Sequence, residues 1–219
     1  TAWGRVGDLF EEDGQIDVPG MWQMAGFDRH QYTNVRYPFP FDPPYVPQEN
    51  PCGLYEHTFE YEVDQNAPEV FLNFEGVDSC FYVWLNGAYV GYSQVSHSTS
   101  EFDVTSYVKS GENTMRVLVL KWCDGSYLED QDKFRMSGIF RDVYLLKRPQ
   151  RHIWDYRITT HVEGAAAAVD VHCLLAGGDL PIYARIENAE GQVVAEGSLR
   201  SLANKGQKSG LAESGKEQE

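Results

Sequence analysis

Residues 54–63 read LYEHTFEYEV, and this stretch decides the fold. Aromatic or apolar side chains alternate with acidic or polar ones: Tyr55, His57, Phe59, Tyr61 and Val63 against Glu56, Thr58, Glu60 and Glu62. Successive side chains of a strand point to opposite faces, so a period of two over ten residues predicts a half-buried β-strand.

Similar strand signals recur along the chain, at residues 70–74, 80–85, 89–93, 114–122 and 138–146. Asn86-Gly87 separates two of them and is a dipeptide that suits a two-residue hairpin turn. No segment sustains a helical period. The regular spacing of the turns predicts an all-β fold in which two sheets pack as a sandwich.

A second β region follows Arg148-Pro149-Gln150, with strand signals at residues 153–162, 168–175 and 182–194 and a turn at Glu190-Gly191. It is too short for an immunoglobulin-like module, which needs roughly 100 residues and seven strands. We therefore predict a sandwich domain over residues 1–148, with its first strands missing, and an incomplete second domain over residues 149–201. Residues 202–219 are rich in Lys, Glu, Gly and Ser and are predicted to be disordered.

Composition excludes several classes of partner. The 219 residues carry a net charge of −15, which argues against binding to nucleic acid or anionic membranes. No apolar run approaches the ~20 residues of a membrane span. The four cysteines, Cys52, Cys80, Cys123 and Cys173, lack metal-ligand spacing and are predicted to be buried free thiols in a reducing compartment. We expect a cytoplasmic location and leave a periplasmic one open, because the sequence starts within a domain.

The richest chemistry lies in residues 124–143, DGSYLEDQDKFRMSGIFRDV. Four carboxylates lie within nine positions: Asp124, Glu129, Asp130 and Asp132. Their mutual repulsion costs Coulomb energy unless a cation, hydrogen-bond donors or a polyol ligand offsets it. A solvated acidic loop is the ordinary alternative. The interleaved Tyr127, Phe134 and Phe140 favour a packed loop, and carboxylates held beside aromatic faces suit a sugar.

A run of prolines covers residues 38–51. Prolines deny ladder hydrogen bonds and favour an extended course. The sequence leaves open whether this loop is a functional wall, a wrapping arm or a rigid connector.

Ordered motifs extend along most of the first domain: Val18-Pro19, Trp22-Gln23-Met24, Tyr32-Thr33-Asn34-Val35, Tyr37-Pro38, Pro43-Pro44, Val46-Pro47, Glu49-Asn50-Pro51, Trp84, Asn86-Gly87, Gly91-Tyr92, Ser100-Glu101-Phe102-Asp103 and Met136-Ser137-Gly138-Ile139-Phe140-Arg141-Asp142-Val143. With them the chain closely resembles the amino-terminal region of the large bacterial β-galactosidases of glycoside hydrolase family 2, strongly over residues 18–148. The resemblance implies a jelly-roll, galactose-binding-like β-sandwich followed by an immunoglobulin-like domain that is cut short here.

The same resemblance implies a parent enzyme that hydrolyses terminal β-galactosides such as lactose with retention of configuration. Retention needs two carboxyl groups about 5–5.5 Å apart. The acids in the turn from Glu129 to Asp132, called the acidic turn below, could reach that separation on their own. In the family, however, the acid/base glutamate follows an Asn on a separate (β/α)8 barrel, and this chain contains no Asn-Glu dipeptide. We therefore expect no catalytic residue in this chain and no activity from it alone. Its implied partners are the barrel of its own enzyme and further copies in a homo-oligomer.

By resemblance, Asn34 and Asp132 contact the galactosyl group, and Asp132 also ligates a sodium ion. Gln94 and Asp124 match positions that help to hold a peripheral magnesium ion, while the magnesium of the active site is bound outside this chain. Amides donate and accept hydrogen bonds, and carboxylates suit hydroxyls and hard cations. Lys133-Phe134 departs from the Trp often found beside the sodium ligand. A free-standing carbohydrate-binding module and a structural assembly domain remain the alternatives.

Overall fold

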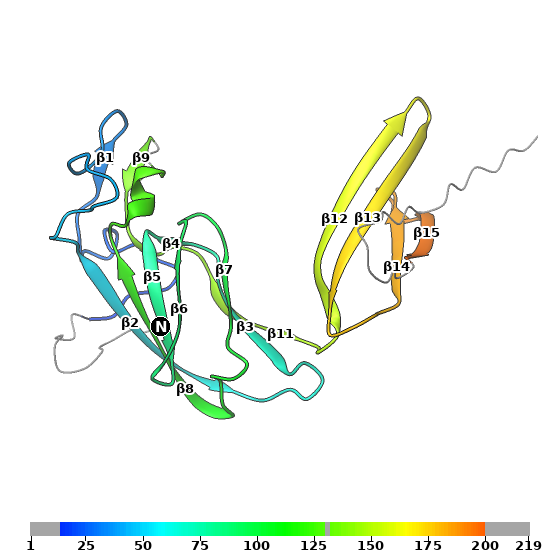
Figure 1. Cartoon of the computed structure of the whole chain (residues 1–219), viewed down its shortest axis with the longest axis horizontal. Helices are drawn as coiled ribbons and strands as arrows, with labels where there is room; N and C mark the ends of the chain where they lie inside the picture. The colour runs from blue at the N-terminus through cyan, green and yellow to red at the C-terminus, as the bar shows by residue number, and fades with distance from the viewer. Residues whose placement is uncertain (1–13, 130–131, 200–219) are drawn as a thin grey trace, which may run out of the picture. The chain divides into compact units, whose positions relative to one another are not determined.

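The computed structural model describes residues 14–129 and 132–199, which form β-strands joined by turns and loops (Figure 1). The chain divides into two compact units between Lys147 and Arg148, and each unit is described by itself. In the described residues the only helical segment is the short 3₁₀ helix η2 (Asp124–Tyr127). None of the described residues forms a helix with the length and apolar character of a membrane span.

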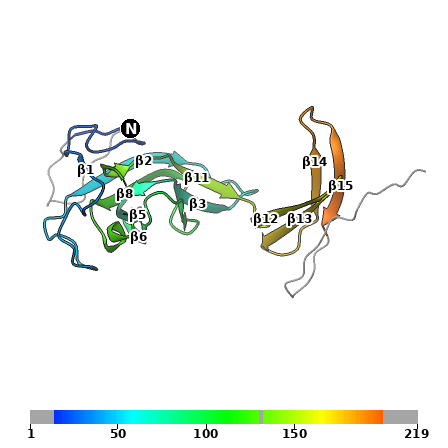
Figure 2. The ribbon, with the colours of Figure 1, turned by 90° about the horizontal axis from the view of Figure 1, so that it is seen from above.

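The larger sheet of the first unit has four antiparallel strands in the order β2, β8, β5 and β6 (Figure 2). They span Cys52–Tyr61, Gly111–Leu120, Cys80–Leu85 and Ala88–Gln94, respectively. The predicted hairpin between β5 and β6 is confirmed, because Asn86 and Gly87 have φ angles of 53° and 83°, as a two-residue turn requires. Strand β2 ends at Tyr61, so the predicted strand residue Val63 lies beyond it.

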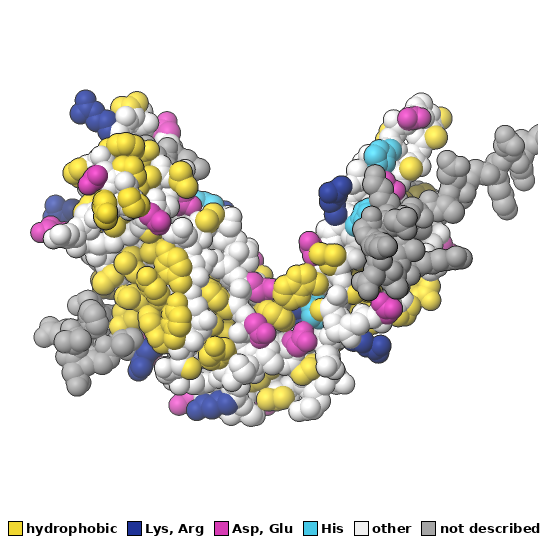
Figure 3. Space-filling view, in the orientation of Figure 1, with side chains coloured by type: hydrophobic (Ala, Val, Ile, Leu, Met, Phe, Trp, Pro, Cys, Tyr) yellow, Lys and Arg dark blue, Asp and Glu magenta, His cyan; other side chains and the backbone are white. Residues whose placement is uncertain are grey.

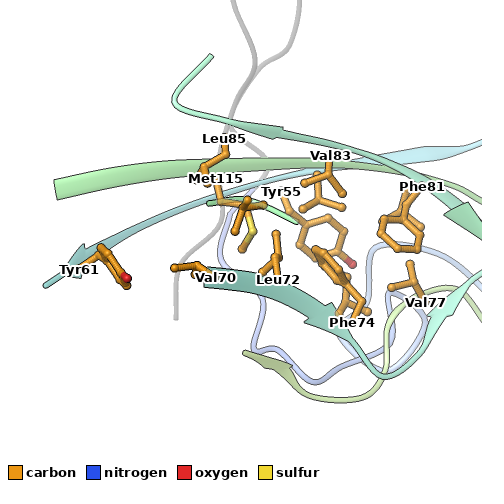
Figure 4. Packing of buried hydrophobic residues seen from close by; sticks show 14 of the residues in the cluster. Tyr55, Tyr61, Val70, Leu72, Phe74, Val77, Phe81, Val83, Leu85 and Met115 are labelled. Carbon is orange, nitrogen blue, oxygen red and sulfur yellow. The ribbon is translucent and has the colours of Figure 1, made fainter. Parts of the chain in front are cut away.

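The second sheet contains β11 (Val143–Arg148), β3 (Glu69–Phe74) and β7 (Ser100–Asp103). Side chains of β3 face those of β5 and β8 across the core, where the rings of Phe74 and Phe81 lie 4.8 Å apart (Figure 4). Phe74, Val83 and Leu85 are completely buried. These two packed sheets confirm the prediction of an all-β sandwich.

Two short pairings complete the first unit: β1 (Gln31–Thr33) with β9 (Lys133–Arg135), and β4 (Val77–Asp78) with β10 (Gly138–Ile139). The prediction of one continuous strand over residues 138–146 is wrong, because β10 and β11 belong to different sheets. The Phe140 ring packs over Gly76, where a Cβ would lie 2.7 Å from the ring. Phe140 lies between β10 and β11, where the chain leaves one sheet for the next.

The second unit consists of two antiparallel ribbons. Strand β12 (His152–Glu163) pairs with β13 (Ala166–Ala176), and β14 (Ile182–Glu187) pairs with β15 (Val193–Leu199). Tyr156, Val162 and Tyr183 are 66%, 73% and 79% exposed, since a two-stranded ribbon covers little apolar surface. The incomplete immunoglobulin-like domain stays a prediction, and the predicted disordered tail, residues 202–219, lies outside the described residues.

All four cysteines are free, but the prediction that all are buried is only half right. Cys80 and Cys123 are buried, whereas Cys52 is exposed and Cys173 is half-buried. Cys52 is the first residue of β2, next to the exposed Pro51, and Cys173 belongs to a two-stranded ribbon. Burial of a thiol here depends on a covering layer that these two positions do not have.

Raising the pH above 10 is expected to destabilise the first unit through Tyr55. Its hydroxyl accepts the Trp22 indole N–H at 2.5 Å, and burial raises the pKa of Tyr55 from 10.0 to about 12. Because the pKa of Tyr55 is higher in the folded than in the unfolded state, Tyr55 makes its full contribution to stability at pH values below its unfolded-state pKa. It is lost as the pH rises toward the folded pKa, by about 1.4 kcal/mol per pH unit. The variant Tyr55→Phe should flatten the slope of unfolding free energy between these two pKa values in urea titrations; equal slopes would contradict this role.

Candidate functional site

The β1–β9 ribbon brings together two segments that are far apart in sequence. Its register pairs Thr33 with Lys133, so the next residues along the two strands, Asn34 and Asp132, leave the ribbon at the same end. The Tyr32 hydroxyl donates to Asp132 Oδ1 at 2.5 Å, and this hydrogen bond is the main cause of a raised pKa of Tyr32. The Asn34 side chain lies near the same hydroxyl and opposes that shift of the Tyr32 pKa. The structure thus places both sequence-predicted sugar contacts around one hydroxyl group.

An aromatic surface lies beside these polar groups. Phe134 is paired with Tyr32 in the ribbon and their ring centroids are 5.6 Å apart. His30 packs edge-on against Phe134 at 5.2 Å. Because Phe134 is 53% exposed, it offers an apolar ring face next to the Asp132 carboxylate.

The acidic turn is fixed by a partner for each described carboxylate. Glu129 accepts hydrogen bonds from the Ser96 backbone N–H at 2.8 Å and from the Ser96 hydroxyl at 2.6 Å. Arg135 ties the turn to the ribbon, since it donates to the Glu129 carbonyl and to the Thr33 hydroxyl, both at 3.1 Å. Asp130 lies outside the described residues. Within the described ranges, no group of three or more His, Cys, Asp or Glu side chains is placed to hold a metal ion.

The proline-rich loop packs around Tyr127 of η2. The Tyr127 hydroxyl donates to the Tyr45 carbonyl at 2.6 Å and accepts the Asp42 N–H at 3.1 Å. In return the Tyr37 hydroxyl donates to the Tyr127 carbonyl at 3.1 Å. Phe39 and Phe41 pack edge-on against the Tyr127 ring, with centroids 5.2 and 5.6 Å away. The loop is therefore joined directly to the turn that carries the acidic residues.

Gln94 and Asp124 come from separate elements that adjoin. Gln94 ends β6 and accepts the Tyr92 hydroxyl at 2.8 Å. Asp124 begins η2 and accepts the N–H of Gly125 at 2.9 Å. The Gln94 carboxamide oxygen lies 3.7 Å from the position of a Cβ on Gly125, so Gln94 packs on the residue next to Asp124. The two oxygen-bearing side chains thus border one turn.

Sequence reasoning missed Asp78, a largely but not fully buried carboxylate beside the acidic turn. Burial raises the pKa of Asp78, and the Lys133 ammonium, 3.3 Å away, opposes that shift. Asp78 also lines a small pocket together with Pro38, Trp122, Ser126, Glu129, Lys133, Arg135 and Met136. A lone Asp in a two-residue strand carries no pattern, and only the pairing of β4 with β10 brings it beside the ribbon.

The comparisons with known proteins concern the family and the fold of the chain. The family described as "Glycosyl hydrolases family 2, sugar binding domain" matches residues 2–149. A β-galactosidase of Actinobacillus pleuropneumoniae is 60% identical over 144 residues, which are 66% of this chain and 14% of that protein. A β-galactosidase of Staphylococcus xylosus is 48% identical over 187 residues, which are 84% of this chain and 19% of that protein. The chain thus spans less than a fifth of these relatives.

A solved structure of a β-glucuronidase from an uncultured Clostridium species is similar with a TM-score of 0.58 and 24% identity, over 67% of this chain and 28% of that one. At this identity the likeness concerns the fold. Together with the profile match over residues 2–149, it leads to one conclusion: the chain belongs to glycosyl hydrolase family 2, as its sugar-binding domain followed by further β-structure.

Proposed function

We propose that this chain is the amino-terminal portion of a retaining β-galactosidase and supplies outer contacts to the galactosyl subsite. One observation carries the proposal: the β1–β9 ribbon brings Asn34 and Asp132 together around Tyr32. The relatives named as β-galactosidases support the substrate class, terminal β-galactosides such as lactose. The catalytic barrel belongs to the remainder of the same enzyme, which assembles as a homo-oligomer.

The end of the β1–β9 ribbon that carries Asn34 and Asp132, called the ribbon end below, has side chains that suit a galactosyl group. A carboxylate accepts hydrogen bonds on two oxygens with about four lone-pair directions, and Tyr32 uses one of them on Asp132. The Asn34 amide both donates and accepts, so it can match a hydroxyl in either role. The exposed Phe134 ring offers an apolar surface to the C–H face of the sugar.

The proposed cations are sodium at Asp132 and magnesium at Gln94 and Asp124. Carboxylate and carboxamide oxygens are suitable ligands for hard cations. Because no described cluster offers three acidic, His or Cys ligands, each ion would need backbone, sugar or water oxygens, or ligands from the rest of the enzyme. The sodium ion would supply a fixed positive charge to sugar oxygens, while Tyr32 holds the Asp132 carboxylate in place.

In the complete enzyme, Asp132→Asn is expected to weaken galactosyl binding roughly ten- to a hundredfold and to abolish the response to sodium. The change removes one charge-assisted acceptor, which contributes about 1.5–3 kcal/mol per hydrogen bond. Inhibition constants for a galactosyl inhibitor, measured across a sodium titration, report both effects. Asp142→Asn, at an exposed position after β10, is the matched control and should keep the wild-type response. An unchanged sodium response in Asp132→Asn would refute the assignment.

A further inference from the structure

The outer face of the four-stranded sheet carries a group of aromatic rings that the galactosyl site does not use. Strands β5 and β6 pair Tyr82 with Tyr92 and Trp84 with Tyr89. These residues alternate with Phe81, Val83 and Leu85, which point into the core. The four rings, called the aromatic platform below, therefore lie on the opposite face of the same two strands.

The platform is continuous, and its β6 rings are open to solvent while Tyr82 and Trp84 of β5 are half-buried. Ring centroids are 4.8 Å apart for Tyr82 and Tyr92, 5.7 Å for Trp84 and Tyr89, and 6.2 Å for Tyr82 and Trp84. Tyr89 is 52% exposed and Tyr92 40% exposed. Figure 3 shows hydrophobic side chains gathered in one broad patch on the first unit, where Figure 1 draws β2, β8 and β5.

The charged side chains nearest to the platform are paired with each other. Next to Tyr82 and Trp84 in the register lie Leu118 and Arg116 of β8. Arg116 forms an ion pair with Glu56 of β2 at 2.6 Å, so the two charges neutralise each other. Further along the same face Glu60 of β2 lies opposite Glu112 of β8, and the chain has a net charge of −15, so this face suits an uncharged ligand better than an anionic one.

We propose that the aromatic platform binds a neutral oligosaccharide or polysaccharide chain, at a site separate from Asn34 and Asp132. The exposed Tyr89 and Tyr92 rings and the half-buried Tyr82 and Trp84 rings offer flat apolar faces to the C–H faces of successive sugar rings. Polar groups stand at the border to meet the sugar hydroxyls: the Tyr92 hydroxyl oxygen, which can still accept a hydrogen bond, and the Glu56–Arg116 pair. A platform of this kind would hold the protein on a neutral glycan, while the separate site at Asn34 and Asp132 binds the terminal galactosyl residue.

The test uses the whole 219-residue chain in native gels that contain linear β-1,4-galactan. The polymer should retard the wild-type chain, and Tyr89→Ala and Trp84→Ala should each weaken binding about tenfold, as expected for the loss of one stacking ring. Tyr89→Phe keeps the ring and should keep most of the retardation. Asp132→Asn should remain retarded like the wild type, which separates this site from the galactosyl contacts.

Several results would overturn the proposal. No retardation of the wild-type chain by galactan would do so, as would equal retardation by anionic polygalacturonate. Retardation that is lost in Asp132→Asn but kept in Tyr89→Ala would place the sugar at the ribbon end. Concentration-dependent dimers in sedimentation that Tyr89→Ala abolishes, without any effect of galactan, would identify the platform as a protein interface. Because Tyr89 is half exposed, its replacement tests binding without emptying the core.

Discussion

Gly138→Ala is expected to lower the free energy of unfolding by about 2–5 kcal/mol, as the sum of a backbone cost and a steric cost. Gly138 has a φ of 124°, which disfavours any residue with a Cβ. That Cβ would also lie 2.9 Å from the Gly20 carbonyl and 3.0 Å from the Tyr55 hydroxyl. Gly20 cannot move away easily, because its N–H donates to the Ile139 carbonyl at 2.7 Å.

Gly87→Ala is the matched control for this prediction. Gly87 also has a positive φ, 83°, but no neighbouring atom lies within 4 Å of its added Cβ. The Gly87→Ala variant should therefore lose only about 1–2 kcal/mol of unfolding free energy, which is the backbone cost. Urea denaturation of both variants measures the difference, which isolates the clash at Gly138. Equal losses would mean that the strand β10 shifts freely to admit the methyl group.

Tyr127→Ala is expected to cost about 3–5 kcal/mol and to release the proline-rich loop from η2. The change removes a buried ring that packs against Tyr37, Phe39 and Phe41. It also leaves the Asp42 N–H and the Tyr45 carbonyl without the hydroxyl that joins them. Denaturant midpoints report the stability, and the rate of proteolytic cleavage within residues 38–51 reports the release of the loop.

Tyr127→Phe separates the two roles of this side chain. It keeps the ring and removes the hydroxyl, so the expected loss is about 1–3 kcal/mol for the unpaired backbone groups. Wild-type cleavage rates in Tyr127→Ala would show that the prolines, rather than Tyr127, hold the loop.

Local sequence patterns predicted the elements whose signal is complete within a few consecutive residues. The alternation of Tyr55 and Tyr61 with acidic residues marked the buried face of β2, and both tyrosines are buried. Asn86-Gly87 marked the hairpin between β5 and β6, because the turn needs a positive φ at both positions. In each case the physical requirement is satisfied within a few residues, so the sequence displays it.

Features that depend on distant contacts were not visible in the same way. Nothing near Asp78 indicates that Lys133 will face it, since the pairing of β4 with β10 decides that contact. The break between β10 and β11 coincides with a contact of the Phe140 ring on Gly76, a residue far away in the sequence. Asn34 and Asp132 were predicted by resemblance alone, and their proximity depends on the β1–β9 register.

The β1–β9 ribbon also has a consequence for the order of folding. Tyr32 and Asp132 are one hundred positions apart, and nearly all of the sandwich lies between them. The entropy cost of closing such a loop falls sharply once the intervening strands have packed, so the ribbon closes after the sandwich forms. On a ribosome, Asn34 is synthesised early but must wait for Asp132 to emerge. The end of the ribbon therefore takes up its geometry only in a chain that has been synthesised past β9 and whose intervening strands have packed.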